Sequence, residues 1–205
     1  MKKAAPKLSL RERKKLQVET EITKNALRLF QKKGYAAVSI EEIAECANIS
    51  KGTFYNYFPN KDDVLIKIAH NSMRIVSDRL DVMPDHSDPV NLLRQTFYFL
   101  LDDIYSWQTV AREIALAGVT NENARNVVYQ LIVDNVRRAQ EIGVFRKDYS
   151  YDVIARSLMG IYYIAIFGLD PSLSLAECKA QLNTAFSIIL EGVLCDKAVS
   201  TEKQQ

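Results

Sequence analysis

Apolar residues recur along most of this chain at intervals of three and four positions, the spacing that gathers them on one face of an α-helix. Between residues 10 and 33, Ile22, Leu29 and Phe30 lie on such a stripe, and Gly34 follows where a helix would end. No stretch keeps up the alternation of apolar and polar residues that is typical of a β-strand. The pattern predicts an all-α protein.

Two short helices are predicted next, and each has a clear start. Residues 39–42 read Ser-Ile-Glu-Glu, a capping box in which the serine hydroxyl and the last glutamate satisfy each other's backbone N–H groups. This helix ends near Asn48, a residue that tolerates left-handed backbone geometry. Ser50 can then cap a second short helix over residues 51–58. This helix must end before Pro59, because a proline disfavours helical geometry in the residue before it. Two short helices joined by a tight turn predict a helix-turn-helix motif.

Longer helices separated by loops are predicted over the rest of the chain. Their expected ranges are 61–81, 89–105, 107–117, 121–142, 151–168 and 174–195. We therefore divide the chain into four parts: a basic flexible arm (1–15), a helix-turn-helix domain (16–62), a helical body (63–197) and a polar tail (198–205).

The helix predicted after Ser50 has two faces with different chemistry. At about 100° per residue, Phe54 and Phe58 lie together and are expected to point into the core. The remaining positions carry small, polar or hydroxylated aromatic side chains: Gly52, Thr53, Tyr55, Asn56 and Tyr57. Glycine permits close backbone approach, Asn pairs with base edges and hydroxyls bind phosphates, so this face suits the major groove of DNA.

Charge is distributed unevenly along the chain. Residues 1–70 hold 14 Lys and Arg against 8 Asp and Glu, whereas residues 71–205 hold 13 against 17. A basic first third indicates that this end meets a polyanion. Lys51 and Lys61 can neutralise phosphates on either side of the candidate helix, and the helix N-terminus at Ser50 can receive one. For the basic arm, DNA contact and simple solvation stay open as equal alternatives.

Together these signals resemble the DNA-binding domain of the TetR family of bacterial transcriptional regulators. The resemblance covers about residues 18–66 and rests on Gly34-Tyr-x-x-Val-Ser-Ile-x-x-Ile-Ala44, Ala47-x-Ile-Ser-Lys-Gly-Thr-Phe-Tyr55 and Tyr57-Phe-x-Asn-Lys-Asp-Asp-Val-Leu65. It implies an all-α fold with a three-helix DNA-binding head and a helical body for ligand binding and dimerisation. It also implies phosphate or base contacts at Ser39, Lys51, Gly52, Thr53, Tyr55, Asn56, Tyr57 and Lys61.

Two positions depart from the family pattern. Glu41 stands in a turn where some members place basic or polar groove contacts. Asn56 replaces an aromatic or other residue seen in many members, so the operator sequence of a relative cannot be transferred to this chain.

The body holds two further predicted sites. Aromatic and methionine side chains line apolar pockets, and they equally fill helical cores, so pocket and core stay open as alternatives for each. The selected pocket residues are Phe97, Tyr98, Tyr105, Trp107, Tyr129, Met159, Tyr162 and Tyr163. By resemblance, the last two helices pair with their copies in a second subunit; the alternative is a core within one chain. The selected interface residues are Ile154, Leu158, Ile161, Phe186, Ile189, Leu190 and Val193.

Other classes of protein find little support in the sequence. Its 48% hydrophobic and 25% charged residues are ordinary for a globular protein. The N-terminus has no apolar leader, and the longest apolar stretch, 158–169, is shorter than the roughly 18 residues of a membrane span, so we expect a cytoplasmic protein. Two isolated histidines predict no metal site, and no cofactor is expected. Three cysteines without CxxC spacing favour reduced thiols over a redox pair: Cys46, Cys178 and Cys195.

The sequence favours a homodimeric repressor that a small, mostly apolar ligand releases from a palindromic double-stranded DNA operator. An alternative keeps the same fold and DNA binding but places the regulator under a protein partner, or leaves it constitutive. A third hypothesis, an all-α enzyme, is disfavoured because the sequence shows no nucleophile–base constellation or metal cluster.

Overall fold

The computed structural model of the chain describes residues 9–83, 88–120, 122–168, 170 and 172–193. Over these residues it is all-α, as predicted, and no strand is found. The chain forms two compact units, residues 1–68 and 69–205, which we call the head and the body. The helices are α1 (Leu10–Lys33), α2 (Ile40–Cys46), α3 (Lys51–Tyr55), α4 (Lys61–Asp81), α5 (Pro89–Ser106), α6 (Gln108–Thr120), α7 (Glu122–Glu141), α8 (Tyr151–Phe167) and α9 (Leu175–Val193).

The first helix begins earlier than the predicted flexible arm allows. Ser9 and Glu12 form a complete capping box: the Glu12 carboxylate accepts from the Ser9 N–H at 2.8 Å, and the Ser9 hydroxyl accepts from the Glu12 N–H at 3.3 Å. Residues 10–15 are therefore helical, while residues 1–8 lie outside the described part. At the other end, Gly34 adopts a positive φ of 81° and its N–H bonds Phe30 O, which stops the helix as predicted.

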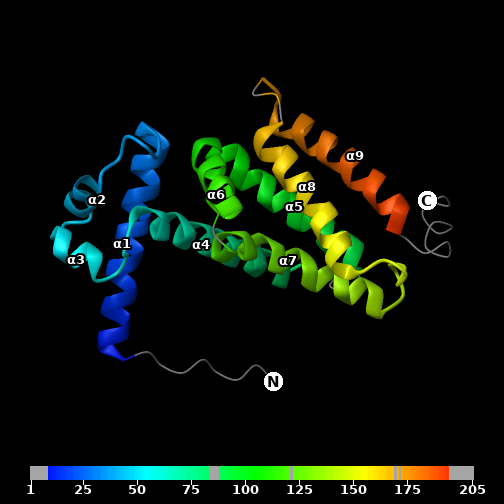
Figure 1. Cartoon of the computed structure of the whole chain (residues 1–205), viewed down its shortest axis with the longest axis horizontal. Helices are drawn as coiled ribbons and strands as arrows, with labels where there is room; N and C mark the ends of the chain where they lie inside the picture. The colour runs from blue at the N-terminus through cyan, green and yellow to red at the C-terminus, as the bar shows by residue number, and fades with distance from the viewer. Residues whose placement is uncertain (1–8, 84–87, 121, 169, 171, 194–205) are drawn as a thin grey trace. The chain divides into compact units, whose positions relative to one another are not determined.

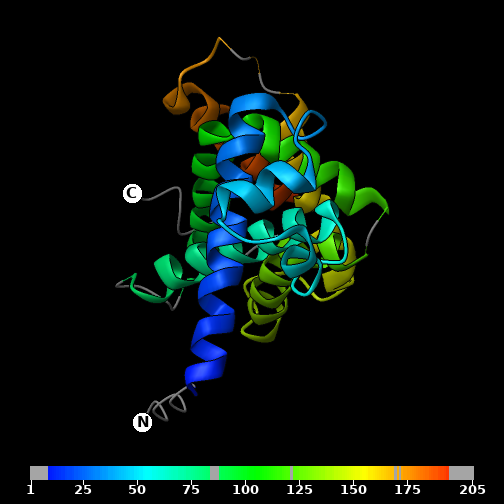
Figure 2. The same cartoon turned by 90° about the vertical axis from the view of Figure 1, so that its left-hand side faces the viewer.

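Local signals also set the ends of α2 and α3; α2 packs against the long α1, and α3 packs against α2 (Figure 2). The Ser39 hydroxyl accepts from the Glu42 N–H at 3.1 Å, but the Glu42 carboxylate pairs with Lys33, so only half of the predicted capping box forms. Asn48 has the predicted left-handed geometry, with a φ of 53°. Ser50 caps α3 through the Thr53 N–H.

The third helix is shorter than predicted. It ends at Tyr55 instead of residue 58, and Asn56 is its C-cap. Phe54 and Phe58 are nevertheless buried, which confirms their predicted inward direction, and their ring centroids lie 5.9 Å apart. Because a helix this short is not stable in isolation, its position depends on these two side chains in the head core.

The predicted helices of the body are confirmed to within a few residues. In Figure 1, α8 and α9 lie side by side, and both contact α5. Six of the residues selected for a subunit interface are buried in the body's own core: Ile154, Leu158, Ile161, Phe186, Leu190 and Val193. The seventh, Ile189, is partly buried and packs against this core. The burial of these six side chains within their own chain argues against their assignment to an interface, whereas the half-buried Ile189 stays a candidate.

No helix within the described ranges is both long enough and apolar enough to cross a membrane.

Candidate nucleic-acid interface

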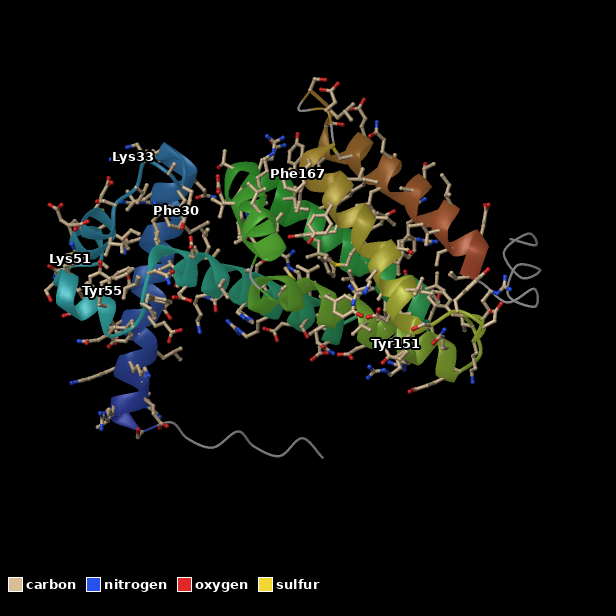
Figure 3. The ribbon with its side chains drawn as sticks, in the orientation of Figure 1. Phe30, Lys33, Lys51, Tyr55, Tyr151 and Phe167 are labelled. Atoms are coloured by element: carbon tan, nitrogen blue, oxygen red, sulfur yellow. The ribbon has the colours of Figure 1, made fainter. Side chains whose placement is uncertain are left out.

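The candidate interface is centred on α3 and the turn that follows it. Lys51, Gly52, Tyr55 and Asn56 are exposed, and Thr53 and Tyr57 are half-buried. Figure 3 shows Lys51 and Tyr55 on α3, and Tyr55 keeps 46% of its surface exposed although its ring edge packs against Phe54. The head therefore holds the apolar side of α3 fixed and presents polar groups and one tyrosine to solvent.

The two serines selected for DNA contact act as helix caps. Ser39 precedes α2 and Ser50 precedes α3, and each accepts a backbone N–H bond from three residues further along. Ser50 also exchanges a hydroxyl hydrogen bond with Thr53, at 2.9 Å. Accepting a capping bond leaves a serine hydroxyl its proton to donate, so the cap and a phosphate contact are compatible at Ser39.

Lys61, selected as a phosphate contact, is largely engaged in holding the head together. Its ammonium donates to the carbonyls of Tyr35 and Val38, both at 2.8 Å, and lies 4.1 Å from the centre of the Tyr35 ring. The Tyr35 hydroxyl in turn donates to the Asp62 carboxylate. We call these four residues the clasp. It uses two of the three Lys61 N–H groups and ties the loop before α2 to the start of α4.

An ion pair occupies the front of the interface. Lys51 at the start of α3 pairs with Glu41 of α2, and both side chains are more than half exposed. The hydrogen bond from Lys51 lowers the pKa of Glu41, and the same bond raises the pKa of Lys51. The acidic residue that departs from the family pattern thus already pairs with the ammonium of Lys51, which was predicted to contact a phosphate.

An open groove with basic residues runs beside α3. The first turns of α1 provide one side of it with Arg11, Lys14 and Lys15, and the other side includes Asn56 and Tyr57. The sequence interpretation treated these cations as part of a flexible arm. The signal that locates them is the box formed by Ser9 and Glu12, whose Ser-x-x-Glu spacing is readable in the sequence.

A second candidate site lies inside the body, where α4, α5, α6, α7 and α8 enclose an apolar cavity. Two of the residues selected for a pocket, Trp107 and Tyr162, line it. The other nine lining residues were not selected, and they include Ser72, Met73 and Asp103. The cavity leaves room for about one water molecule. Apart from Met73, no pattern in the sequence pointed to them, because the cavity exists only where five helices meet.

The other residues selected for the pocket lie elsewhere in the body. Phe97 and Met159 are buried in the core. The Tyr129 hydroxyl donates to Asp152. Burial, and to a smaller extent this bond, raises the pKa of Tyr129 to about 12. The remaining three make separate surface contacts: Tyr98 with Lys179, Tyr105 with the Leu173 carbonyl and Tyr163 with Phe167. None of these six lines the cavity, so their selection as pocket residues is not supported.

A helix-turn-helix held on a third helix, with a polar face on its second short helix and basic residues around it, defines a DNA-binding protein. The family model for bacterial regulatory proteins of the tetR family matches residues 22–68. The Transposon Tn10 TetC protein of Escherichia coli is 32% identical over 170 residues, which are 75% of this chain and 80% of that protein. The chain belongs to the TetR family of bacterial transcriptional regulators, whose members are typically repressors.

Further relatives match this chain over different lengths. The uncharacterized HTH-type transcriptional regulator YuxN of Bacillus subtilis is 46% identical over 61 residues, or 30% of this chain and 19% of YuxN. The chain spans less than half the length of the first curated relatives that it matches. Among solved structures, FadR of Thermus thermophilus, a TetR family repressor in complex with lauroyl-CoA, has a TM-score of 0.69 and 26% identity, and the match covers 86% of this chain and 95% of FadR.

Proposed function

We propose that this protein is a homodimeric repressor that a small, mostly apolar ligand releases from a palindromic operator. The observation that carries the proposal is the course of α4. This single uninterrupted helix starts in the clasp at Lys61 and Asp62 and supplies Ser72 and Met73 to the cavity of the body. One helix therefore supplies residues to both candidate sites.

In this proposal α3 enters the major groove. Asn56 pairs with base edges, Gly52 allows close approach, and the hydroxyls of Thr53, Tyr55 and Tyr57 reach bases or phosphates. Phosphate contacts come from Ser39, Ser50, Lys51 and the remaining N–H of Lys61. The basic residues at the start of α1 extend the contact along the DNA backbone, and their place beside Asn56 and Tyr57 supports this role.

The proposed subunit interface is the outward face of α8 and α9. Exposed apolar side chains recur there at helical spacing, with Val153 57%, Ile164 58% and Ile188 67% exposed, and Phe167 lies at the end of α8 (Figure 3). An added side chain at Gly160 or Gly192 would meet nothing within 4 Å, so both helices present open surface at these points. Two such pairs of helices, related by a two-fold axis, would bury these residues and set two heads one DNA turn apart.

The small size of the cavity suggests how a ligand would control DNA binding. A molecule larger than water must separate the helices that line the cavity, and α4 is one of them. Since the clasp fixes the start of α4 to the loop before α2, a displaced α4 would reposition the DNA-facing helices. The ligand then shifts the population between two states because it binds only the one with the widened cavity. The lauroyl-CoA complex of the related FadR supports a ligand with a long apolar part.

A second candidate function is a regulator of the same fold without a small-molecule inducer, which a protein partner controls or which acts constitutively. The observation that favours it is the size of the cavity, since room for about one water molecule is far below the space that a ligand needs.

Selection of bound sequences from a random DNA pool tests the proposal. We expect a short palindrome, bound with a steep salt dependence. The double variant Tyr55→Ala with Asn56→Ala should lose this preference and bind about tenfold or more weakly at about 150 mM salt, since each lost base contact costs about 1–3 kcal/mol. Equal binding of random and selected DNA by the wild-type protein would contradict a sequence-specific repressor. A palindrome without any apolar ligand that releases it would favour the second function.

A further inference from the structure

The cavity of the body has an unusual electrostatic character. Asp103 of α5 is the one ionisable acid among its lining residues, and no Lys, Arg or His side chain of the described residues lines it. The rest of the wall is apolar or aromatic except for the Ser72 hydroxyl. A carboxylate in such surroundings loses the water that would stabilise its charge.

The Asp103 carboxyl has only one polar side-chain partner in the described part of the chain, the Ser72 hydroxyl, which donates to it. No cation of these residues lies within ion-pair distance. Burial raises the pKa of Asp103, while the Ser72 bond and the charge of Arg79 oppose this change and the neighbouring Asp102 adds to it. Asp102 itself differs, because it pairs with Lys179 at 2.6 Å. Asp103 is therefore a partly desolvated acid without a counter-ion.

Two aromatic rings complete the surroundings of this acid. Trp107 follows α5 and Tyr162 lies on α8, and both line the same cavity. A tyrosine hydroxyl is neutral near pH 7, and burial raises the pKa of Tyr162 further, so it adds no charge to the wall. Aromatic faces attract cations, most strongly where water is excluded. The acid and the rings thus favour the same kind of ligand group.

We propose that the ligand of this cavity is an amphipathic cation, an amine or quaternary ammonium ion with an alkyl or aryl body, whose charged end pairs with Asp103. The inference rests on the proposed ligand control and names the class of ligand. The charged end of the ligand is the counter-ion that Asp103 otherwise lacks. The alkyl or aryl part of the ligand packs against Met73, Trp107 and Tyr162 as the helices separate. An anionic ligand would instead meet the like charge of Asp103.

The test compares three probes with one decyl chain and different ends, namely decyltrimethylammonium, decanol and decanoate, with lauroyl-CoA as a second anion. Each is added below its micelle threshold to the full-length protein, and binding is measured by calorimetry and by release of the selected palindrome. We expect decyltrimethylammonium to bind best and to release the DNA. Asp103→Asn should weaken its binding by more than about tenfold, because a desolvated charge pair is lost. Asp102→Asn, which removes the same charge one residue away and outside the cavity, should leave it unchanged.

The outcomes separate this inference from the function it rests on. If decanoate, decanol or lauroyl-CoA binds best and releases the palindrome, ligand control stands and the cationic class is overturned. If decyltrimethylammonium binds equally to Asp103→Asn, or if no probe binds, the assignment to Asp103 is overturned. Should Asp103→Asn fail to fold, the wild-type comparison of decyltrimethylammonium with decanol decides instead, because the two probes share one chain and differ in charge. Equal affinity of the wild-type protein for both probes contradicts the inference.

Discussion

The head and the body are both built from helices, yet their sequences specify structure in different ways. In the head, single residues fix where each helix begins and ends: Ser9, Gly34, Ser39, Asn48 and Ser50. The body helices are capped as well, at Asp88, Ser150 and Ser174, but their apolar stripes leave open what each face meets. The comparison teaches that caps and turns are readable one position at a time, whereas the partner of an apolar face is a property of the assembled fold.

The largest expected effect comes from the small core of the head. Phe54→Ala removes a side chain that is fully buried beside Phe58 and should destabilise the head by about 3–5 kcal/mol. Operator binding should be lost, because α3 has little else to hold it. Hydrogen–deuterium exchange should show loss of protection in residues 9–68 alone.

The matched change in the body is Phe186→Ala, a ring equally buried at 5.6 Å from Phe97. It should cost a similar free energy of unfolding but lower protection in residues 69–193 instead. If either variant lowers protection in both units to the same extent, the head and the body unfold as one cooperative structure and the contrast between them fails.

The next largest effect concerns the outward face of α8 and α9. Ile188→Glu places a charge on a side chain that is 67% exposed and should weaken the proposed dimer by about 2–4 kcal/mol. Sedimentation should show monomers, and operator affinity should fall because each head then reads a half-site alone. Ile142→Glu, at a position 55% exposed just after α7, is the control and should remain dimeric. A dimeric Ile188→Glu variant would mean that another surface joins the subunits.

This face also marks the limit of what the sequence could predict. All the body helices were predicted within a few residues, but the interface was assigned to inward residues such as Leu158 and Phe186. In α8 nearly every face is apolar, so periodicity alone cannot tell the inward side from the outward one. Ile164 and Ile188 are distinguished by their exposure in the folded body, 58% and 67%. Asp103 was missed for the same reason, since a cavity has no signature in a single helix.

The head was predicted more fully, and its errors are local. The polar face of α3 and both inward phenylalanines were recognised, because a helical wheel suffices for one short helix on a core. The engagement of Lys61 with Tyr35 and Val38 was not, since it joins residues more than twenty positions apart. Sequence spacing therefore predicted which side of α3 is polar and which is buried, but not which donors of the candidate interface are already in use.

A moderate effect is expected from opening the clasp. Lys61→Met leaves the carbonyls of Tyr35 and Val38 without their charged donor and should destabilise the head by about 1–2 kcal/mol, as measured by urea unfolding. Operator affinity should fall by about tenfold, because the loop that leads to Ser39 is released. The control is Lys67→Met, further along α4, which breaks an ion pair with Glu19 of α1 and should change operator affinity little. If Lys61→Met lowers only the salt dependence of binding and leaves stability intact, Lys61 acts as a phosphate contact and the clasp does not hold the loop.

The smallest expected effect comes from the ion pair between Lys51 and Glu41, the acidic residue that departs from the family pattern. Glu41→Gln frees Lys51 from its exposed partner, so the plot of the logarithm of affinity against that of salt concentration should steepen by up to about one unit. Binding to random DNA should gain as much as binding to the operator, because a phosphate contact carries no sequence information. Glu45→Gln removes an equal charge from α2 without touching Lys51 and serves as the control. A gain confined to the operator would instead assign Glu41 a part in base reading. If Glu41→Gln and Glu45→Gln raise DNA affinity equally, Glu41 acts only through the net charge of the head.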